Sequence, residues 1–355
     1  MVTNVQIMYE DLNESIKGAI AYVEDLSCRQ LLYPLIDSMI SHVRSVLIGL
    51  LKEGVSLSTV ELGPNAEDEV ECSIAAQTVI HQVPEMMKSH LLSLPKTTSV
   101  VAATEELCLR ILTTYVSIAS LLRPVNELSR LRTAKDMAAI EALVLPYCTT
   151  GASISGGSSC PVMKEFKAFR QLLFSEDAPA NSNTKASSTN NTKNNSNNNN
   201  STSSITPAPS RSRILSLPFI SSLRPSTLLG HLISCAPPQL PSPHDNGNNN
   251  PVNYFEVLTH PSPSKTYMAT KGDGLSIRSL YSSNGDWRGI ESEVFSWESI
   301  QECLDIFLQR AGVADPITKT SMRAWYESLM DIGGQYYGNV GPSVRLDSLA
   351  VAEIQ

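Results

Sequence analysis

Long stretches of this chain repeat apolar residues at intervals of three and four, the spacing that places side chains on one face of an α-helix. In the stretch 24–51 the repeat runs through Leu31, Leu35, Met39, Val43, Val46 and Leu50. A helix of that length would extend roughly 40 Å at about 1.5 Å per residue, which favours a rod-like stack over a compact globule. Alternation of apolar and polar residues is scarce. The periodicity therefore predicts an all-α fold.

Residues 121–148 predict a helix end, a turn and a second helix. Pro124 disfavours helical geometry at Arg123, so a helix over 98–122 should end there. A second helix fits Asn126–Leu145, and Pro146 is expected to stop it. The apolar stripe expected to form its buried face comprises Leu128, Leu131, Ala134, Ala138, Ala142 and Leu145.

Composition divides the chain into helical and non-helical parts. Residues 1–174 are predicted to form a helical rod segment, and 214–332 a C-terminal helical segment with a Pro/Asn-rich loop near 236–253. Between them, residues 175–213 form an Asn/Ser-rich insert, which has too little apolar surface to offset its ordering entropy and is predicted to be disordered. Residues 333–355, which begin Gly-rich, are predicted to be a flexible tail.

Within these segments, further helices are expected over 66–84, 162–173, 214–234, 297–311 and 317–332.

The charge balance excludes two classes of partner. A net charge of −8 without a basic stripe argues against nucleic-acid binding and against docking on an anionic membrane surface. The longest uncharged apolar-leaning stretch is 111–122, whereas a membrane-spanning helix needs about 20 residues. We therefore expect no transmembrane segment, and the N-terminus shows no targeting pattern.

Candidate metal and redox sites are weak. The seven cysteines are scattered without a C-x-x-C pair, which indicates reduced thiols in a cytosolic protein. His81, Glu85 and His90 come nearest to a metal-binding set, but Pro84 is expected to interrupt their helix. No metal and no cofactor are predicted.

Catalytic motifs are equally weak. The Gly/Ser-rich loop at 151–160 lies beside Cys160, which leaves open a Ser or Cys hydrolase or a transferase, although no set of nucleophile, base and orienting residue is identifiable. Gly333, Gly334, Gly338 and Gly341 follow a helix rather than a strand, the wrong context for dinucleotide binding. The preferred prediction is a protein without enzymatic activity, and an unrelated cytosolic helical scaffold is the alternative.

The segment LLRPVNELSRLRTAKDMAAIEALVLPYC resembles the C-terminal half of the fifth-subunit family of the conserved oligomeric Golgi complex. Two later blocks, FKAFRQLLF and LLGHLISCAPPQLPSPH, agree with that family in the same order, so the resemblance covers about residues 98–310 and more loosely 24–60. It implies that the family's N-terminal helical portion is missing from this chain. The matching positions are Arg123, Pro124, Glu127, Arg130, Leu131, Asp136, Glu141 and Pro146 in the first block, Phe169, Arg170, Leu172, Leu173 and Phe174 in the second, and Ala236, Pro237, Pro238, Ser242, Pro243 and His244 in the third.

This resemblance implies an elongated stack of antiparallel helices of the helical-rod tethering type. The implied function is the capture of recycling vesicles in intra-Golgi retrograde transport, by protein–protein interaction and without a cofactor. The implied location is the cytosol and the cytosolic face of Golgi membranes, reached through the complex. The implied partners are other subunits of the complex, especially the seventh, and indirectly Golgi SNAREs or small GTPases. The matching positions are expected to be structural.

Overall fold

The computed structural model describes residues 2–56, 70–123, 125–148, 160–175, 208–245, 250–260, 277–281, 287, 290–311 and 316–338. Within these ranges every regular element is helical, so the all-α prediction is confirmed. The α-helices are α1 (Val2–Ser27), α2 (Tyr33–Leu47), α3 (Gly49–Ser56), α5 (Ile74–His90), α6 (Thr98–Ala119), α7 (Glu127–Cys148), α8 (Pro161–Leu173), α9 (Arg211–Leu215), α10 (Pro225–Cys235), α11 (Pro251–Thr259), α12 (Glu291–Ala311) and α13 (Pro316–Tyr337). Short helical segments of other types are η1 (Cys28–Leu32), η3 (Ile220–Ser222), η4 (Pro243–Asp245) and η6 (Ile277–Tyr281).

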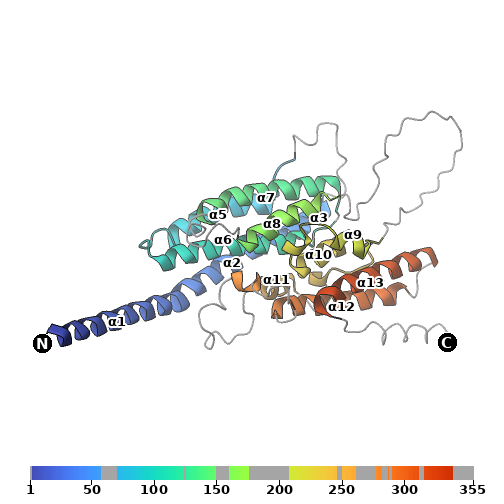
Figure 1. The fold of residues 1–355 in the computed structure, drawn as a ribbon. Helices are drawn as coiled ribbons and strands as arrows, with labels where there is room; N and C mark the ends of the chain where they lie inside the picture. The colour runs from blue at the N-terminus through green and yellow to red at the C-terminus, as the bar shows by residue number, and fades with distance from the viewer. Residues whose placement is uncertain are drawn as a thin grey trace.

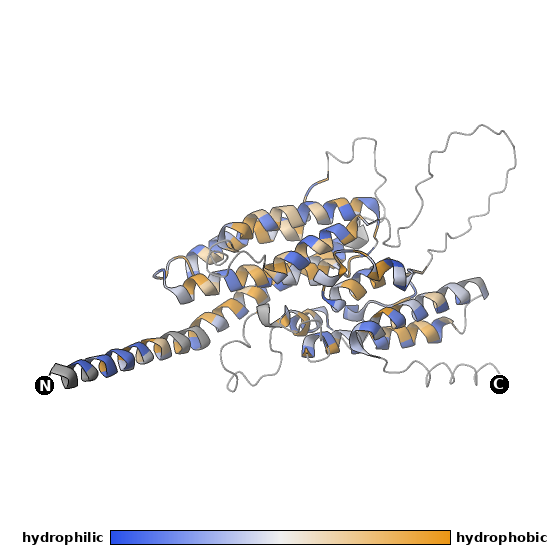
Figure 2. Cartoon of the chain, in the orientation of Figure 1, coloured by the Kyte–Doolittle hydropathy of each residue, from blue (hydrophilic) through white to orange (hydrophobic). Residues whose placement is uncertain are grey.

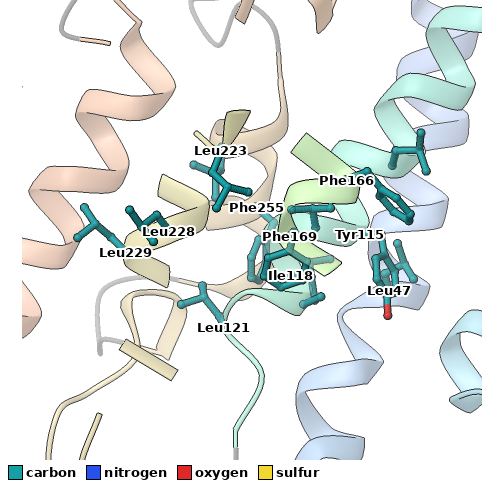
Figure 3. Close-up of a cluster of buried hydrophobic side chains, with 14 of the residues drawn as sticks. Leu47, Tyr115, Ile118, Leu121, Phe166, Phe169, Leu223, Leu228, Leu229 and Phe255 are labelled. Carbon is teal, nitrogen blue, oxygen red and sulfur yellow. The ribbon is translucent and has the colours of Figure 1, made fainter. Parts of the chain in front are cut away.

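Helix α6 is the centre of the core. From Leu107 to Ala119 it is buried on every face, because α2, α7, α8, α10 and α11 all pack against it. Figure 1 shows α5, α7 and α8 beside α6, the pair α12–α13 at the other end, and α10 and α11 between. Figure 3 shows a buried apolar cluster to which α6, α8 and α10 contribute. Its side chains include Tyr115 and Ile118 from α6, Phe166 and Phe169 from α8, and Leu228 and Leu229 from α10.

Several polar side chains inside α6 have hydrogen-bond partners within the core. Thr113 donates to the carbonyl oxygen of Leu109 at 3.1 Å, one turn back along the same helix. Arg110 donates through Nε to Glu106 at 2.8 Å and through Nη1 to Asp37 on α2. Glu106 also accepts from the backbone N–H of Ile277 at 2.6 Å. Buried charges in α6 therefore join it to α2 and η6.

The N-terminal helices differ from the single repeat predicted over 24–51. A π-helical segment, η1, precedes α2, and Pro34 lies in the first turn of α2. A π turn takes an extra residue, and beside it Leu32 and Ile36 are buried where Leu31 and Leu35 were expected. Farther along the predicted repeat, Met39, Val43 and Leu50 are buried as expected. By length and composition alone, the helical stretch Gln30–Glu53 is long and apolar enough to cross a membrane, whereas no such stretch was expected. Its apolar face packs against α5 and α6 as a core helix does.

Two prolines lie inside helices that they were expected to stop. α5 begins at Ile74, with Ser73 as its N-cap, and continues past Pro84 to His90. Val83 and Met87, on either side of Pro84, are fully buried, so packing outweighs the cost of about 3 kcal/mol that an internal proline imposes. α7 likewise includes Pro146 in its last turn and ends at Cys148.

The buried face of α7 is not the predicted stripe. Ala138, Ala142 and Leu145 are exposed, and Leu128, Leu131 and Ala134 are only half-buried. The face that packs against α5, α6 and α8 comprises Ser129, Thr133, Asp136, Met137, Ile140 and Val144. Apolar residues occur on several sides of this helix, so their spacing alone did not determine which side its neighbours cover.

The end of the chain also differs from the predicted flexible tail. α13 continues through Gly333 and Gly334 to Tyr337, and Gly338 follows in a left-handed conformation with a φ of 84°. A Cβ atom on Gly333 would lie 2.2 Å from the ring of Trp297 on α12. Trp297 also stacks on Tyr337 with ring centroids 5.4 Å apart. The glycine therefore permits the close packing of α12 and α13. Residues 339–355 lie outside the described ranges, as does most of the predicted insert, although α9 already begins at Arg211.

We predict that Gly333→Ala destabilises the protein by about 1–3 kcal/mol, because the rigid indole of Trp297 occupies the space the methyl group needs. At a helix position with free space the same change stabilises by up to about 1 kcal/mol. Gly49→Ala is the matched control, since its Cβ would meet Ala75 at an ordinary 3.8 Å. Thermal unfolding followed by circular dichroism measures both variants. A Gly333→Ala variant as stable as Gly49→Ala would contradict the packing described here.

Candidate functional site

The first-block residue Arg123 joins the end of α6 to the segment around the end of α10. Its Nη1 donates to the carbonyl oxygen of Leu240 at 2.7 Å, and its Nη2 donates to that of Ile233. Burial lowers the pKa of Arg123 to about 10, which leaves it charged at neutral pH. These carbonyl groups lie in the third block, so Arg123 connects the first and third blocks. Pro124 lies outside the described residues.

Asp136 holds the N-terminus of α5 against α7. Its carboxylate accepts from the backbone N–H of Ser73 at 2.8 Å and from the Ser73 hydroxyl at 2.6 Å. Ser73 in turn caps α5 by accepting from the N–H of Ala76 at 3.0 Å. The hydroxyl of Tyr115 on α6 donates to Asp136 at 3.3 Å. Burial raises the pKa of Asp136, and the hydrogen bonds from Ser73 act in the opposite direction.

We predict that Asp136→Ala lowers the free energy of unfolding by about 1–3 kcal/mol, because the buried N–H and hydroxyl groups of Ser73 lose their acceptor. Glu127→Ala, on the exposed first turn of the same helix, is the control and should change stability by less than about 0.5 kcal/mol. Urea unfolding at neutral pH measures both. Equal midpoints for the two variants would show that Asp136 does not hold α5 in place.

The second block contacts both of the others. Arg170 donates to Glu141 on α7 at 2.7 Å, which joins α8 to the first block. Phe169 packs edge-on against His231 on α10, with ring centroids 5.9 Å apart, which joins α8 to the third block. Burial lowers the pKa of His231 to about 3, so this ring is neutral. Each of the three blocks therefore contacts the other two in the folded protein.

The remaining signature positions have unequal surroundings. Leu172, Leu173, Ala236 and Pro243 are buried, whereas Phe174, Pro238 and Pro146 are exposed. Arg130, Leu131, Pro237, Ser242 and His244 are half-buried. The hydroxyl of Ser242 lies 2.7 Å from Nδ1 of His244, whose pKa is lowered to about 4 by burial. Packing and hydrogen bonds within the core explain part of the set, and the assignment of all these positions to the family signature stays a prediction.

Sequence reasoning missed a fully buried cluster of charged residues, which surrounds Arg224. This side chain is fully buried, and its Nε donates to both carboxylate oxygens of Glu165 at 3.1 Å. Its Nη1 lies 3.6 Å from Glu293, and its Nη2 donates to the hydroxyl of Ser117 at 2.9 Å. The cluster joins α6, α8 and α12 to the start of α10.

Hydroxyl and backbone amide groups donate further hydrogen bonds to the carboxylates of Glu165 and Glu293. Glu293 accepts from the backbone N–H of Ser226 at 2.9 Å and from the hydroxyl of Tyr337 at 2.9 Å. Glu165 accepts from Thr227 at 2.5 Å and from the hydroxyl of Tyr281. Burial acts to lower the pKa of Arg224, but Glu165, Tyr281 and Glu293 outweigh it and the pKa lies above its ordinary value. The carboxylates are thus engaged in joining helices.

One signal in the sequence pointed to this cluster. Glu165 lies three residues after Val162 and four before Phe169, so a charged residue occupies the apolar face of its helix. A carboxylate on a buried face requires a partner, because an unpaired buried charge is very costly. Arg224 stands alone as a charged residue between Ile214 and His231, but the spacing does not say that it is the partner.

The weaker candidates from the sequence do not gather into a site among the described residues. His81, Glu85 and His90 are exposed on α5, and no group of three or more His, Cys, Asp or Glu side chains within the described ranges is placed to hold a metal ion. Cys160 is half-buried at the start of α8 with a free thiol. The loop 151–159 beside it lies outside the described residues.

Two curated proteins match the chain. One, from Arabidopsis thaliana, is 24% identical over 268 residues, which is 71% of this chain. The other, from Mus musculus, is 26% identical over 161 residues, which is 45% of this chain. Both are named conserved oligomeric Golgi complex subunit 5.

The chain is similar to this Golgi complex subunit. It spans 26% of the length of the Arabidopsis subunit 5 and 18% of the length of the mouse subunit 5. No protein-family model and no solved structure matches it. The resemblance to subunit 5 is confirmed by the matches to the Arabidopsis and mouse proteins.

Proposed function

We propose that this chain is a component of a Golgi vesicle-tethering complex and occupies the place of subunit 5. The observation that carries the proposal is the match to subunit 5 from a plant and from a mammal. The all-α fold supports it, as do the contacts that join the three family-like blocks in one core. We propose further that the complex acts in intra-Golgi retrograde transport, by capturing recycling vesicles before fusion.

In this proposal the chain binds proteins and catalyses no reaction. Its partners are other subunits of the complex, above all the seventh, and indirectly Golgi SNAREs or small GTPases. It reaches the cytosolic face of Golgi membranes through the complex, and it uses no cofactor and no nucleic acid. The buried carboxylates of Glu165, Glu293 and Asp136 support a structural role, since each accepts hydrogen bonds that join different helices.

We also propose a division of the chain at the Asn/Ser-rich stretch. Residues 1–174 form one helical segment, and the helices from α9 to α13 form a second, which packs against the first through α6 and α8. The interlocking charges at Arg224 support treating the two segments as one folding unit, because Glu165 lies in the first and Glu293 in the second.

Co-expression with the seventh subunit from the same source, followed by size-exclusion chromatography, tests the assignment. We expect the two chains to co-elute in a fixed ratio at a volume smaller than that of either alone. An unrelated helical protein of similar size, co-expressed in place of the seventh subunit, is the control. Separate elution of well-folded chains at micromolar concentration would refute the pairing.

A further inference from the structure

Helix α1 carries an apolar stripe that is exposed among the residues the structure describes. Tyr9, Leu12, Ile16, Ile20 and Val23, defined here as the α1 stripe, follow one another at intervals of three and four. Their exposed fractions lie between 50% and 71%. Figure 1 shows α1 extending away from the helical core, and Figure 2 shows hydrophobic and hydrophilic residues interspersed along it.

Among the described residues, the exposed stripe lacks the packing partner that normally stabilises an amphipathic helix in water. A helix in water gains most of its stability from packing an amphipathic face against something else. The main contacts of α1 are with the adjoining segment η1, while the core helices lie beyond it. At about 1.5 Å per residue, the 26 residues of α1 extend about 39 Å. That length accommodates a side-by-side helical partner over more than three heptads.

The charge of α1 selects among the possible occupants. The helix contains five acidic residues and one lysine, so its net charge is 1 − 5 = −4. The one lysine, Lys17, forms an ion pair with Glu14 at 2.9 Å. The acidic residues are Glu10, Asp11, Glu14, Glu24 and Asp25.

Repulsion between like charges disfavours two of the three occupants. A second copy of α1 would bring four net negative charges against four more, and an anionic lipid surface repels the helix in the same way. A helix with an apolar seam and lysine or arginine beside it satisfies both the stripe and the charge. We infer that the α1 stripe is the docking face for a basic amphipathic helix of another protein. Where the bound protein is another subunit of the tethering complex, this inference rests on the proposed function and deepens it.

A pair of synthetic helical peptides tests the inference against the full chain. Both have leucine and isoleucine at the seam positions of a heptad repeat. One has lysine at the flanking positions and its twin has glutamate. We expect the lysine peptide to bind on the order of tenfold more tightly than the glutamate twin, as measured by fluorescence anisotropy. Equal binding of the two peptides would overturn the inference.

Substitutions in α1 locate the binding face. Ile16→Asp combined with Ile20→Asp should weaken binding of the lysine peptide by on the order of tenfold or more. Tyr22→Asp is the matched control, because Tyr22 is equally exposed on α1 but lies off the stripe, and its binding should be unchanged. Since these side chains are exposed, all variants should keep the thermal unfolding of the parent. Equal loss of binding in the stripe variant and the control would also overturn the inference.

Two further measurements separate the competing occupants and the two proposals. If the chain self-associates in sedimentation experiments and loses this on Ile16→Asp with Ile20→Asp, the stripe binds a second copy. If it binds phosphatidylserine vesicles and the same double variant does not, the stripe binds a membrane. Either result would overturn the inference. Co-elution with the seventh subunit reports on the proposed function, whereas peptide discrimination reports on the α1 stripe. Failure of one measurement with success of the other therefore identifies which proposal is wrong.

Discussion

Arg224→Met is expected to lower the free energy of unfolding by about 3–5 kcal/mol, because it leaves two carboxylates buried without their cation. Arg224 is fully buried, with Glu165 at 3.1 Å and Glu293 at 3.6 Å. The side chain of methionine fills much of the same volume, so the loss reflects charge and hydrogen bonding more than a cavity. Equilibrium urea unfolding at neutral pH, followed by circular dichroism, measures the change.

Two further variants separate this effect from a general sensitivity to losing an arginine. Arg211→Met removes a partner from an exposed pair, Arg211–Asp331 at 2.8 Å, and should change stability by less than about 1 kcal/mol. Combining Arg224→Met with Glu165→Gln should recover part of the lost stability, because it removes one of the uncompensated charges. If Arg224→Met were as mild as Arg211→Met, the cluster would not be the junction described here.

Ile140→Asp is expected to cost about 3–5 kcal/mol, since it buries a carboxylate without a partner in the core between α7 and its neighbours. Ile140 is fully buried, within the face of α7 that packs against α5, α6 and α8. Ala138→Asp tests the stripe predicted from spacing alone, and should change stability by less than about 0.5 kcal/mol because Ala138 is exposed.

The two aspartate variants give opposite results under the two assignments of the buried face. If Ala138→Asp unfolded the protein and Ile140→Asp did not, the original stripe of Leu131, Ala138 and Leu145 would be the core face and the observed packing of α7 would be wrong. Thermal unfolding at matched protein concentration distinguishes the outcomes. Near-ultraviolet circular dichroism checks that each folded variant retains ordered aromatic packing.

Helices were predicted well where residues close in sequence determine them, and poorly where tertiary packing does. The helices over 98–119 and 161–173 lie close to their predicted positions, because apolar periodicity and caps act within a few residues, whereas α12 begins at Glu291, six residues before its predicted start. The prediction that Pro84 and Pro146 end their helices was wrong, because packing compensates for the missing hydrogen bond and both helices continue past the proline. The prediction of a flexible tail from Gly333 was also wrong, because this glycine lies in α13 and its lack of a side chain lets the helix approach Trp297.

The candidate site was predicted less well. Three separate blocks were identified from the sequence, but that Arg123, Arg170 and Phe169 connect them came from the structure. The charged cluster was missed because its members lie far apart in the chain, with Glu165 59 residues from Arg224 and Glu293 67 residues from Ser226. No local pattern encodes a pairing across such separations.

The sequence by itself determined that this chain is helical and that three blocks resemble a Golgi tethering subunit. The helices depend on apolar residues three or four positions apart, and the resemblance depends on the residues of the three blocks and their order, so both are readable without coordinates. Only the tertiary structure decided which face of α7 is buried, which carboxylates hold Arg224, and which apolar stripe stays uncovered. Burial is set by the elements that pack against a helix, and those elements come from distant parts of the chain.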